Sequence, residues 1–452
     1  MGFTAIWISP VVEQVSDGSR GYHGYSAVNF NALNDNFGTP DDLTELAEAL
    51  HDRGMYLMVD VVANHMAYDG TAETVGYSGL QPFDEEKYYH NVCWINDYDD
   101  QTDVEQCWLG TDSYPLPDLD TTSTEVRDMF STWVEGFVAN YSIDGLRIDT
   151  VKHVEKEFWP IFNSASGVFN LGELADGNVD YFCPYQDYMD GLLDYPSYYQ
   201  ATQFFSNVTK TSENFVNQLL ALNTTCKDST LLGTFSENHD QPRFASYTQD
   251  VTLAKNILTY TMLADGIPII YQGQEQHYSG ATDPYNREAV WFSRYSTQGE
   301  LYDTVQNLNL IRARAVNQST EYLTSRTETV YSDDHTVVFR KGGSAKHMVL
   351  MVVSNLGADA RDTTLTLPAA GFPKKTKLTD VVNCKHVQVD KHGGLEVEIK
   401  DGLPMVFYPR SLVKGSKLCG GKDSAAPRAL AVPLFTTLAL WVALCVYSAV
   451  SL

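Results

Sequence analysis

The chain has 452 residues, of which 43% are hydrophobic, 12% aromatic and 20% charged. This composition supplies a core for a barrel of about 250 residues and a further module, and it argues against global disorder. The formal net charge of −27, from 31 Lys and Arg against 58 Asp and Glu, argues against nucleic acid as a partner, because no basic surface could neutralise phosphates. An acidic surface suits a soluble secreted protein with a neutral ligand.

The N-terminal region predicts a strand, a helix and a second strand. Residues 3–8 are an apolar run that ends before Pro10. Thr39, followed by Pro40 and two aspartates, predicts the start of a helix that ends at Gly54. Residues 55–62 form the next apolar run. This order predicts a right-handed parallel unit.

Residues 66–120 lose this periodicity and are rich in Gly, Asp, Tyr and Pro. A loop of this length is usually functional or a small subdomain. A helical pattern returns at Ser123 and leads into the apolar run 145–148. Further apolar runs follow at residues 168–172, 191–193, 231–235 and 266–271, and nearly all of them end in polar residues.

These seven strands predict an α/β fold, a (β/α)8 TIM barrel, because active sites in such barrels lie at the carboxyl ends of parallel strands. We expect the first strand to be missing from this chain. Beyond residue 321, short alternating runs predict an antiparallel β domain. The expected domains are the barrel (1–65 and 121–320), a loop subdomain inserted after the third strand (66–120), the β domain (321–419) and a C-terminal signal with its tail (420–452).

The seven cysteines form no CxxC or Cys/His pattern, so a zinc site is not expected. Six of them could form disulfides, namely Cys93, Cys107, Cys183, Cys226, Cys384 and Cys419, whereas Cys445 lies in the apolar tail. Four Asn-X-Ser/Thr patterns are candidate glycosylation sites: Asn140, Asn207, Asn223 and Asn317.

The C-terminal tail is uncharged from Ala429 to Leu452 and is long enough to span a bilayer. Small residues precede it, with Gly420, Gly421 and Ser424 as candidate attachment positions. This arrangement favours a glycolipid (GPI) anchor signal whose tail is removed, with a retained membrane helix as the alternative. The sequence as given opens directly on the predicted strand 3–8 and shows no signal-peptide pattern there, although an anchored protein must enter the secretory pathway. We therefore expect the sequence to start late, and the protein to be extracellular, at the cell surface or wall.

Three acids follow predicted strands: Asp149, Glu173 and Asp240. A carboxylate nucleophile beside a carboxylic acid that is held neutral is the apparatus of glycoside hydrolysis. Arg147 lies on the same side of its strand as Asp149 and is expected to help keep that acid ionised. Any one acid could instead cap a helix or pair with an arginine, but this explanation is weaker for all three together.

His65 and His239 each follow an asparagine at a strand end, which favours hydrogen bonding to sugar hydroxyls over a metal pair. Asn64 and Asp118 supply hard oxygen ligands, which suit Ca²⁺ rather than a transition metal. The aromatic residues near these ends could stack on sugar faces or belong to the core. They are Tyr22, Tyr25, Trp94, Tyr98 and Trp108.

Four motifs resemble the α-amylase family of glycoside hydrolases, and most of all the secreted fungal α-amylases and their GPI-anchored cell-wall relatives. They are DVVANH (60–65), GLRIDTVKH (145–153), GE (172–173) and ENHD (237–240), in the family's order. The resemblance runs from residue 1 to about Cys419. It implies retaining endo-hydrolysis of α-1,4-glucosidic bonds in starch-like α-glucans.

The resemblance implies Asp149 as the nucleophile, Glu173 as the general acid/base and Asp240 as the third acid. Substrate would contact Tyr25, His65, Arg147, Lys152, His153, His239, Asp283 and Arg287. It also implies a Ca²⁺ cofactor held by Asn64, Asp118 and the backbone oxygens of Glu105 and His153, which would make 66–120 a calcium-binding subdomain. The cysteine pairs 93/107, 183/226 and 384/419 match fungal amylase disulfides.

The sequence departs from fungal relatives at Ser26, where they tend to carry Trp, and in lacking an early strand and disulfide. Two alternative functions are a cell-wall 4-α-glucanotransferase that uses the same covalent intermediate, and a non-catalytic glucan-binding protein or inactive truncated product. The retained His65 and His239 favour hydrolysis. The expected partner is an α-glucan, with the chain as a monomer that contacts membrane only through its anchor.

Overall fold

The computed structural model describes residues 1–452 except 17, 421–443 and 447–452. The chain divides into two compact units. Of the described residues, the first unit contains those in 4–175 and 184–193 and Val446, and the second contains 1–3, 176–183, 194–420, 444 and 445. Each unit is described by itself.

The first unit is built on a parallel sheet whose strands are ordered β1-β4-β7-β8-β9. These strands are β1 (Ala5–Ile8), β4 (Tyr56–Val61), β7 (Gly145–Ile148), β8 (Phe169–Gly172) and β9 (Gly191–Leu192). Their residues are almost all buried, as expected for parallel strands covered on both faces. The predicted strands of this region are therefore confirmed.

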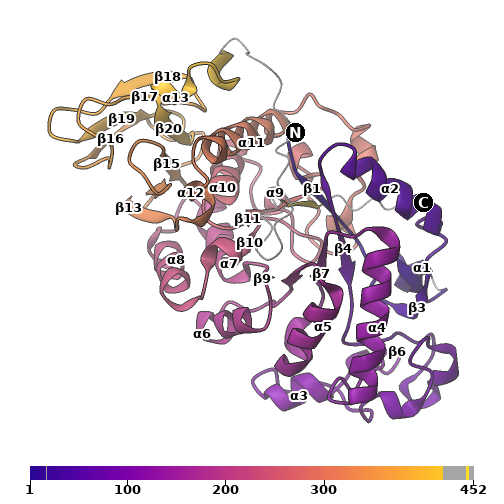
Figure 1. Ribbon diagram of the computed structural model, residues 1–452. Coiled ribbons are helices and arrows are strands. Elements are labelled where there is room, and N and C mark those ends of the chain that lie inside the picture. The colour runs from indigo at the N-terminus through magenta and orange to yellow at the C-terminus, as the bar shows by residue number, and fades with distance from the viewer. Residues whose placement is uncertain (17, 421–443, 447–452) are drawn as a thin grey trace. The chain divides into compact units, whose positions relative to one another are not determined.

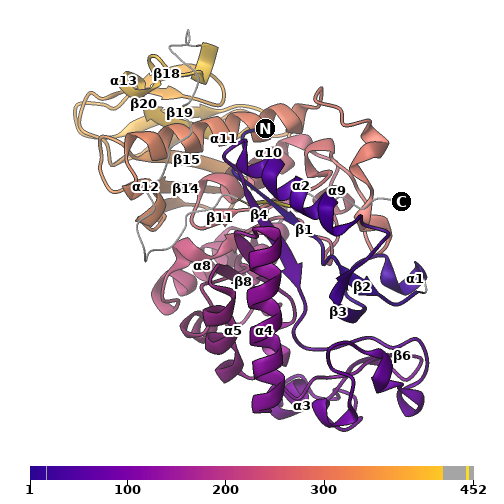
Figure 2. The ribbon, with the colours of Figure 1, turned by 45° about the vertical axis from the view of Figure 1, so that its right-hand side comes forward.

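Three longer helices, α2 (Pro40–His51), α4 (Thr124–Tyr141) and α5 (Trp159–Ser166), belong to this unit. Figures 1 and 2 show α4 and α5 side by side. The predicted start of α2 is confirmed, because the Thr39 side chain accepts a hydrogen bond from the Asp42 amide and Asp42 binds the Thr39 amide in return.

Residues 66–120 contain only short elements, which agrees with the loss of periodicity there. Cys93 and Cys107 form a disulfide within this stretch. Its helix α3 (Gln101–Gln106) packs against the 3₁₀ turn η4 (Val151–His153) that follows β7. The remaining short elements of the unit are β2 (Val12–Gln14), α1 (Gly18–Gly21), β3 (Ala27–Leu33), η1 (Ala72–Thr74), η2 (Tyr77–Gly79), η3 (Glu86–Tyr88), β5 (Leu109–Thr111), β6 (Tyr114–Leu116) and η5 (Lys156–Phe158).

The second unit begins with helices around two short parallel strands, β10 (Gly233–Thr234) and β11 (Ile267–Pro268). Its main helices are α7 (Tyr195–Phe205), α8 (Glu213–Thr225), α10 (Val251–Leu263) and α11 (Glu300–Gln318). The disulfide Cys183–Cys226 joins the segment after α6 to the end of α8. Shorter elements are α6 (Val179–Phe182), η7 (Ser229–Leu231), α9 (Phe244–Tyr247), β12 (Ile270–Tyr271), η8 (Gln274–Gln276), η9 (Tyr285–Arg287), η10 (Val290–Ser293) and α12 (Glu321–Thr324).

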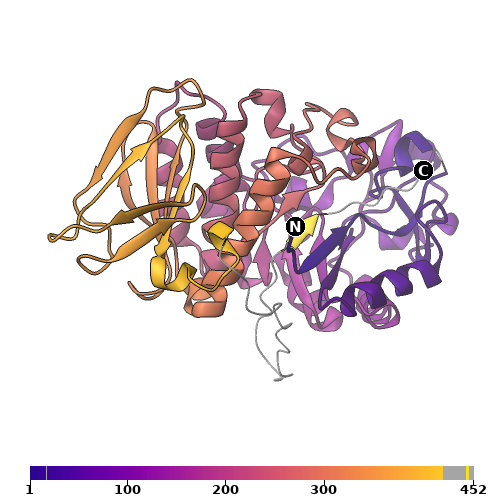
Figure 3. The same cartoon turned by 90° about the horizontal axis from the view of Figure 1, so that it is seen from above.

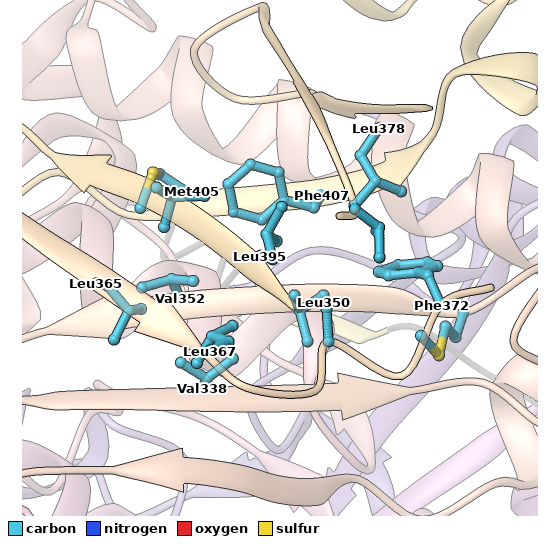
Figure 4. Close-up of a cluster of buried hydrophobic side chains, with 14 of the residues drawn as sticks. Val338, Leu350, Val352, Leu365, Leu367, Phe372, Leu378, Leu395, Met405 and Phe407 are labelled. Carbon is cyan, nitrogen blue, oxygen red and sulfur yellow. The ribbon is translucent and has the colours of Figure 1, made fainter. Parts of the chain in front are cut away.

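The predicted C-terminal β domain is an antiparallel sheet ordered β13-β14-β15-β20-β17-β18, faced by the two-stranded antiparallel sheet β16-β19. Leucine, valine and phenylalanine side chains from both sheets point toward one another and form its core (Figure 4). The strands are β13 (Glu328–Ser332), β14 (Thr336–Lys341), β15 (Val349–Ser354), β16 (Thr363–Leu367), β17 (Lys377–Asp380), β18 (Lys385–Gln388), β19 (Leu395–Ile399) and β20 (Met405–Pro409).

Several contacts fix this β domain within the second unit. Helix α10 packs against β15, where the strands coloured orange to yellow lie beside the helices (Figure 3). The buried Lys341 ammonium donates to Asp265 Oδ1 at 2.6 Å, and Asp265 also accepts hydrogen bonds from Thr327. The disulfide Cys384–Cys419 closes the end of the domain, which contains α13 (Arg410–Val413) and η11 (Leu418–Gly420).

The expected anchor signal and apolar tail fall outside the described residues, apart from Gly420 and the three-residue strand β21 (Leu444–Val446). Within the part of the chain that the structure describes, no helix has both the length and the apolar character needed to cross a bilayer.

Candidate active site

Three carboxylates of the first unit surround the buried guanidinium of Arg147. Its Nη1 atom lies 2.9 Å from Asp60 Oδ1 and 2.6 Å from Asp149 Oδ1, and its Nη2 atom lies 3.2 Å from Glu173 Oε2. The strand register explains this cluster, because Asp60 on β4 pairs directly with Arg147 on β7. Asp149 and Glu173 follow the ends of the neighbouring strands β7 and β8.

The backbone around Asp149 and Glu173 fixes the direction of both side chains. The Thr150 amide donates to Glu173 Oε2 at 3.0 Å, and the Glu173 amide donates to Ile148 O at 2.7 Å. Thr150 has a φ of +51°, which is rare for a β-branched residue and marks local strain of the kind found at functional sites. Gly172 is required at the end of β8, because a Cβ there would lie 2.9 Å from the Val151 side chain.

The cluster contains more negative than positive charge and lies almost out of contact with water. Burial raises the pKa of Asp60 to about 6. Burial also raises the pKa of Asp149 well above its ordinary value, and Glu173 and Asp60 act in the same direction. Arg147 lowers the pKa of Asp149, as its place on β7 led us to expect, but burial outweighs it. The cluster can therefore hold a proton near neutral pH.

Aromatic and histidine side chains enclose Asp60 and Arg147. The Tyr25 hydroxyl donates to Asp60 Oδ2 at 2.7 Å, and the Trp7 indole donates to the same oxygen at 3.1 Å. His65 Nε2 lies 3.2 Å from Tyr25 O, and burial lowers the pKa of His65 to about 4, so its ring is neutral. Sequence reasoning did not select Trp7 or Asp60, since each looks like a residue of a buried strand.

Lys152 and His153 lie just beyond Asp149 and contact Tyr98 of the long loop. The Lys152 ammonium is 5.3 Å from the Tyr98 ring and donates to Ala175 O at 3.3 Å. His153 meets the same ring edge-on at 6.1 Å, and burial lowers its pKa to about 4. Tyr98 is 59% exposed, so its ring is free to contact a ligand. Trp108, by contrast, is buried and belongs to the core.

The remaining predicted substrate contacts form a second group, which lies in the second unit. Arg287 Nη2 donates to Asp240 Oδ1 at 3.3 Å, and Arg287 Nε lies 3.4 Å from Asp283 Oδ1. His239 Nε2 is 3.1 Å from Asp240 Oδ2. The structure thus brings these four residues together, and places Asp149 and Glu173 together in the first unit.

An ion-pair network that sequence reasoning missed supports this second group. The buried Arg243 lies 3.3 Å from Glu237 Oε2 and 3.2 Å from Glu288 Oε2, and it stacks over the Tyr271 ring at 4.0 Å. Glu288 also accepts from the Gly280 amide at 2.8 Å. The network therefore ties the loop that carries Asp283 and Arg287 to the strand end that precedes Asp240.

Two of the predicted calcium ligands have side-chain oxygens that lack a hydrogen-bond partner. Asn64 Oδ1 and Asp118 Oδ1 are both buried and unsatisfied, whereas Asp118 Oδ2 contacts His90 Nδ1 at 2.7 Å. The Leu119 amide donates to Asn64 O at 2.9 Å, which holds the two segments together. Elsewhere in this unit, His153 Nδ1 lies 3.3 Å from Val104 O, and Glu105 is the next residue in the chain.

Orphaned acceptor oxygens of this kind suit a hard cation better than a hydrogen-bond donor. In the described parts of the chain, no three His, Cys, Asp or Glu side chains gather as a metal-binding group.

Of the four candidate glycosylation sites, Asn140, Asn207 and Asn317 are exposed. Asn223 is partly buried, and its Nδ2 atom donates to Thr327 O at 3.2 Å. A glycan on Asn223 would require this contact to break. The three predicted disulfides are all present.

Comparisons with known proteins agree on one family. Residues 1–391 match the family model described as "Alpha amylase, catalytic domain". Alpha-amylase 1 of Schwanniomyces occidentalis is 46% identical over 93% of this chain and 82% of its own length. Alpha-amylase 1 of Lipomyces kononenkoae is 48% identical over 93% of this chain and 68% of its own length. The solved structure of an α-amylase from Malbranchea cinnamomea is 48% identical and has a TM-score of 0.90, covering 92% of this chain and 88% of that one.

Proposed function

The chain belongs to the α-amylase family of glycoside hydrolases, and from this premise we propose that it cleaves internal α-1,4-glucosidic bonds of starch-like α-glucans with retention of configuration. It has the family's TIM-barrel fold with a C-terminal antiparallel β domain, as the sequence predicted. The observation that carries the proposed mechanism is the cluster of Asp149 and Glu173 on one guanidinium, Arg147.

Asp149 and Glu173 have different roles in a double-displacement reaction. Asp149 attacks the anomeric carbon while Glu173 protonates the leaving oxygen, and Glu173 then removes a proton from the water that releases the product. Both carboxylates contact the same guanidinium. This supports the short separation of retaining enzymes, about 5–5.5 Å, over the longer one that accommodates a water in inverting enzymes.

The other predicted residues bind the sugar. Neutral His65 and the Tyr25 hydroxyl can hydrogen-bond to sugar hydroxyls beside Asp149, and Lys152 and His153 serve the leaving-group side. Asp240, positioned by Arg287 and His239, would bind hydroxyls and stabilise positive charge on the ring in the transition state.

Incubation with defined maltooligosaccharides tests hydrolysis against transfer. We expect only products shorter than the substrate, each with a new reducing end. Products longer than the donor would show that a sugar hydroxyl intercepts the intermediate, and would favour the 4-α-glucanotransferase instead.

We also propose that Asn64, Asp118 and the backbone oxygens of Glu105 and His153 hold Ca²⁺. The orphaned Oδ1 atoms of Asn64 and Asp118 support this proposal. When bound, the cation would neutralise Asp118 and tie the long loop to the strand end that carries Asp149. The chain's own residues perform every chemical step.

Removal of calcium should therefore lower both stability and activity. If calcium is present at 1,000 times its dissociation constant, chelation should lower the free energy of unfolding by about 4 kcal/mol. Differential scanning calorimetry should show a lower unfolding temperature that Ca²⁺ restores and Mg²⁺ restores poorly. Asp118→Asn should abolish this response, whereas Asp112→Asn, an exposed acid of the same loop, should keep it. A chelator-insensitive unfolding temperature would contradict the site.

The pH dependence of hydrolysis should depend on Asp60. Above pH 6 the Asp60 carboxyl is ionised, and its charge raises the pKa of Asp149. Asp60→Asn removes that charge, so the Asp149–Glu173 pair should lose its shared proton at a lower pH. The fall in kcat/KM on the alkaline side should therefore begin at a lower pH than in the wild type. Asp128→Asn on the exposed face of α4 is the matched control. An alkaline limb at the same pH in Asp60→Asn and wild type would contradict this effect of Asp60 on the Asp149–Glu173 pair.

An extracellular location is supported by the three disulfides, which persist in oxidising compartments. Attachment to the cell surface or wall through a GPI anchor remains our proposal, since its signal lies outside the described residues. A monomeric state, the glycans and the domain boundaries given above are likewise proposed from the sequence.

A further inference from the structure

A loop of the second unit, residues 280–288, carries Asp283 and Arg287 and lies largely at the surface. Residues 281–285 are all exposed, so burial of hydrophobic surface cannot hold this part of the chain in one conformation. The shape of the loop must therefore come from polar contacts. The short turn η9 supplies one of them, because the Arg287 amide donates to Pro284 O at 3.0 Å.

The carboxylate of Glu288 closes the base of this loop. Its Oε1 atom accepts from the Gly280 amide at 2.8 Å, so one side chain joins the first and last residues of the loop. Its Oε2 atom accepts from Arg243 Nε at 3.2 Å. The Arg243 amide in turn donates to Gly280 O at 3.0 Å. Gly280 is thus held on both sides, by the side chain of Glu288 and by the backbone of Arg243.

Close packing leaves the partners of Glu288 little freedom to move. A Cβ on Gly280 would lie 1.7 Å from Tyr285 O, so the backbones of these two residues pass each other in contact. Arg243 is fully buried, and its guanidinium lies 4.0 Å from the centroid of the Tyr271 ring. Glu288 therefore contacts two groups that packing already fixes in place.

Glu288 also supplies the negative charge that Arg243 requires. Arg243 contacts a second carboxyl group, that of Glu237, at 3.3 Å. Burial raises the pKa of Glu237 to about 7, so below this pH Glu237 is largely neutral and Glu288 carries the negative charge in contact with the guanidinium. A buried cation that loses its charged partner is strongly unfavourable. Arg243 and Glu288 therefore hold each other in place.

The loop that Glu288 closes brings Arg287 to Asp240. Arg287 Nε donates to His239 O at 3.1 Å, and Arg287 Nη2 donates to Asp240 Oδ1 at 3.3 Å. The buried Asn286 donates to the same His239 carbonyl at 3.0 Å. Because Glu288 directly follows Arg287 in the chain, a change at the base of the loop moves the Arg287 guanidinium relative to Asp240.

We propose that Glu288 is a positioning residue for Asp240. Its carboxylate closes the loop 280–288 and thereby fixes Arg287 against Asp240, so Glu288 acts through Arg287 rather than on the sugar. The inference rests on the proposed function for the role of Asp240 in the transition state. A misplacement of about 1 Å in an active site can lower a rate about 10²-fold, and this sets the size of the expected effect.

A double-mutant cycle with Arg287 tests this role. Glu288→Ala should lower kcat/KM for maltopentaose about 10²-fold, mainly through kcat, because Asp240 acts in the transition state. In a chain that already carries Arg287→Ala, the same substitution should cost little more, since its effect passes through Arg287. Losses that multiply in the double variant would overturn the proposal, because they would show that Glu288 does not act through Arg287.

Glu288→Gln separates the two contacts of the carboxylate. Its amide oxygen can still accept from Gly280, but the charge that pairs with Arg243 is gone, so the loss of kcat should be smaller than in Glu288→Ala. Glu300→Ala, which breaks an exposed ion pair with Lys255 in the same unit, is the matched control and should leave kcat/KM unchanged. An equal loss in Glu300→Ala would overturn a role specific to the loop.

The unfolding temperature of each variant, measured by circular dichroism, separates a local effect from a damaged fold. If Glu288→Ala does not fold, the cycle is run with Glu288→Gln, and the same lack of additivity is expected. Failure of the proposed function would appear separately, as a wild-type chain that does not cleave maltopentaose. The cycle is then measured as maltopentaose affinity by isothermal titration calorimetry. Equal weakening by Glu288→Ala with and without Arg287 would again overturn the proposal.

Discussion

Glu173→Gln should lower the rate of starch hydrolysis by about 10²–10⁴-fold, the usual contribution of a general acid/base. The substitution keeps the size of the side chain and an oxygen that can accept from the Thr150 amide, a contact of 3.0 Å in the native protein. The fold should therefore be preserved, and the loss should appear in kcat rather than in KM.

A substrate with a good leaving group separates the role of Glu173 from a structural one. An α-maltosyl fluoride needs no proton on its leaving group, so its first step should survive in Glu173→Gln while release of the sugar is slow. A burst of fluoride followed by slow turnover is the expected result. Glu157→Gln, an exposed acid in the turn after His153, should behave as wild type. Absence of the burst, with the first step as slow on the fluoride as on starch, would contradict the acid/base role.

Asp149→Asn should have the larger effect, a loss of about 10⁴-fold or more, because a nucleophile has no substitute among its neighbours. The variant should be equally inactive on starch and on the maltosyl fluoride, since both require formation of the glycosyl–enzyme bond. Stability should change little or rise, because burial and nearby carboxylates oppose the ionised form of Asp149.

The same experiment should include Asp128→Asn, which removes one exposed aspartate from α4 and should leave both activities intact. Mass spectrometry of Glu173→Gln after incubation with the fluoride should find the sugar on the peptide that contains Asp149. Attachment to a different carboxylate, or turnover of the fluoride by Asp149→Asn, would reassign the nucleophile.

Much of the fold was predictable because the parallel strands are apolar along their bodies and polar at their ends. The capping box at Thr39 and the strand that precedes Asp149 follow directly from local chemistry. In the β domain the predicted runs were 336–340, 347–353, 363–367, 395–399 and 405–408. Strands β13, β17 and β18 were missed, because exposed residues such as Glu328, Lys377 and Lys385 interrupt the apolar pattern.

The site was predictable only in part, because strand register and loop packing decide which residues contact one another in it. Spacing alone places Arg147 beside Asp149, but the contact of Asp60 with Arg147 requires the pairing of β4 with β7. Arg243 and Glu288 are 45 positions apart, and no local pattern joins them. The orphaned oxygens of Asn64 and Asp118 are likewise visible only once the long loop is folded.

The stereochemistry of cleavage tests the central claim most directly. Proton NMR can follow maltopentaose hydrolysis by the wild-type chain during the first minutes, before the new reducing ends equilibrate in water. A double displacement through Asp149 predicts that the α-anomer of the new reducing end appears first and converts slowly to the mixture. First appearance of the β-anomer would contradict a covalent intermediate on Asp149, and with it the roles proposed for the carboxylates around Arg147.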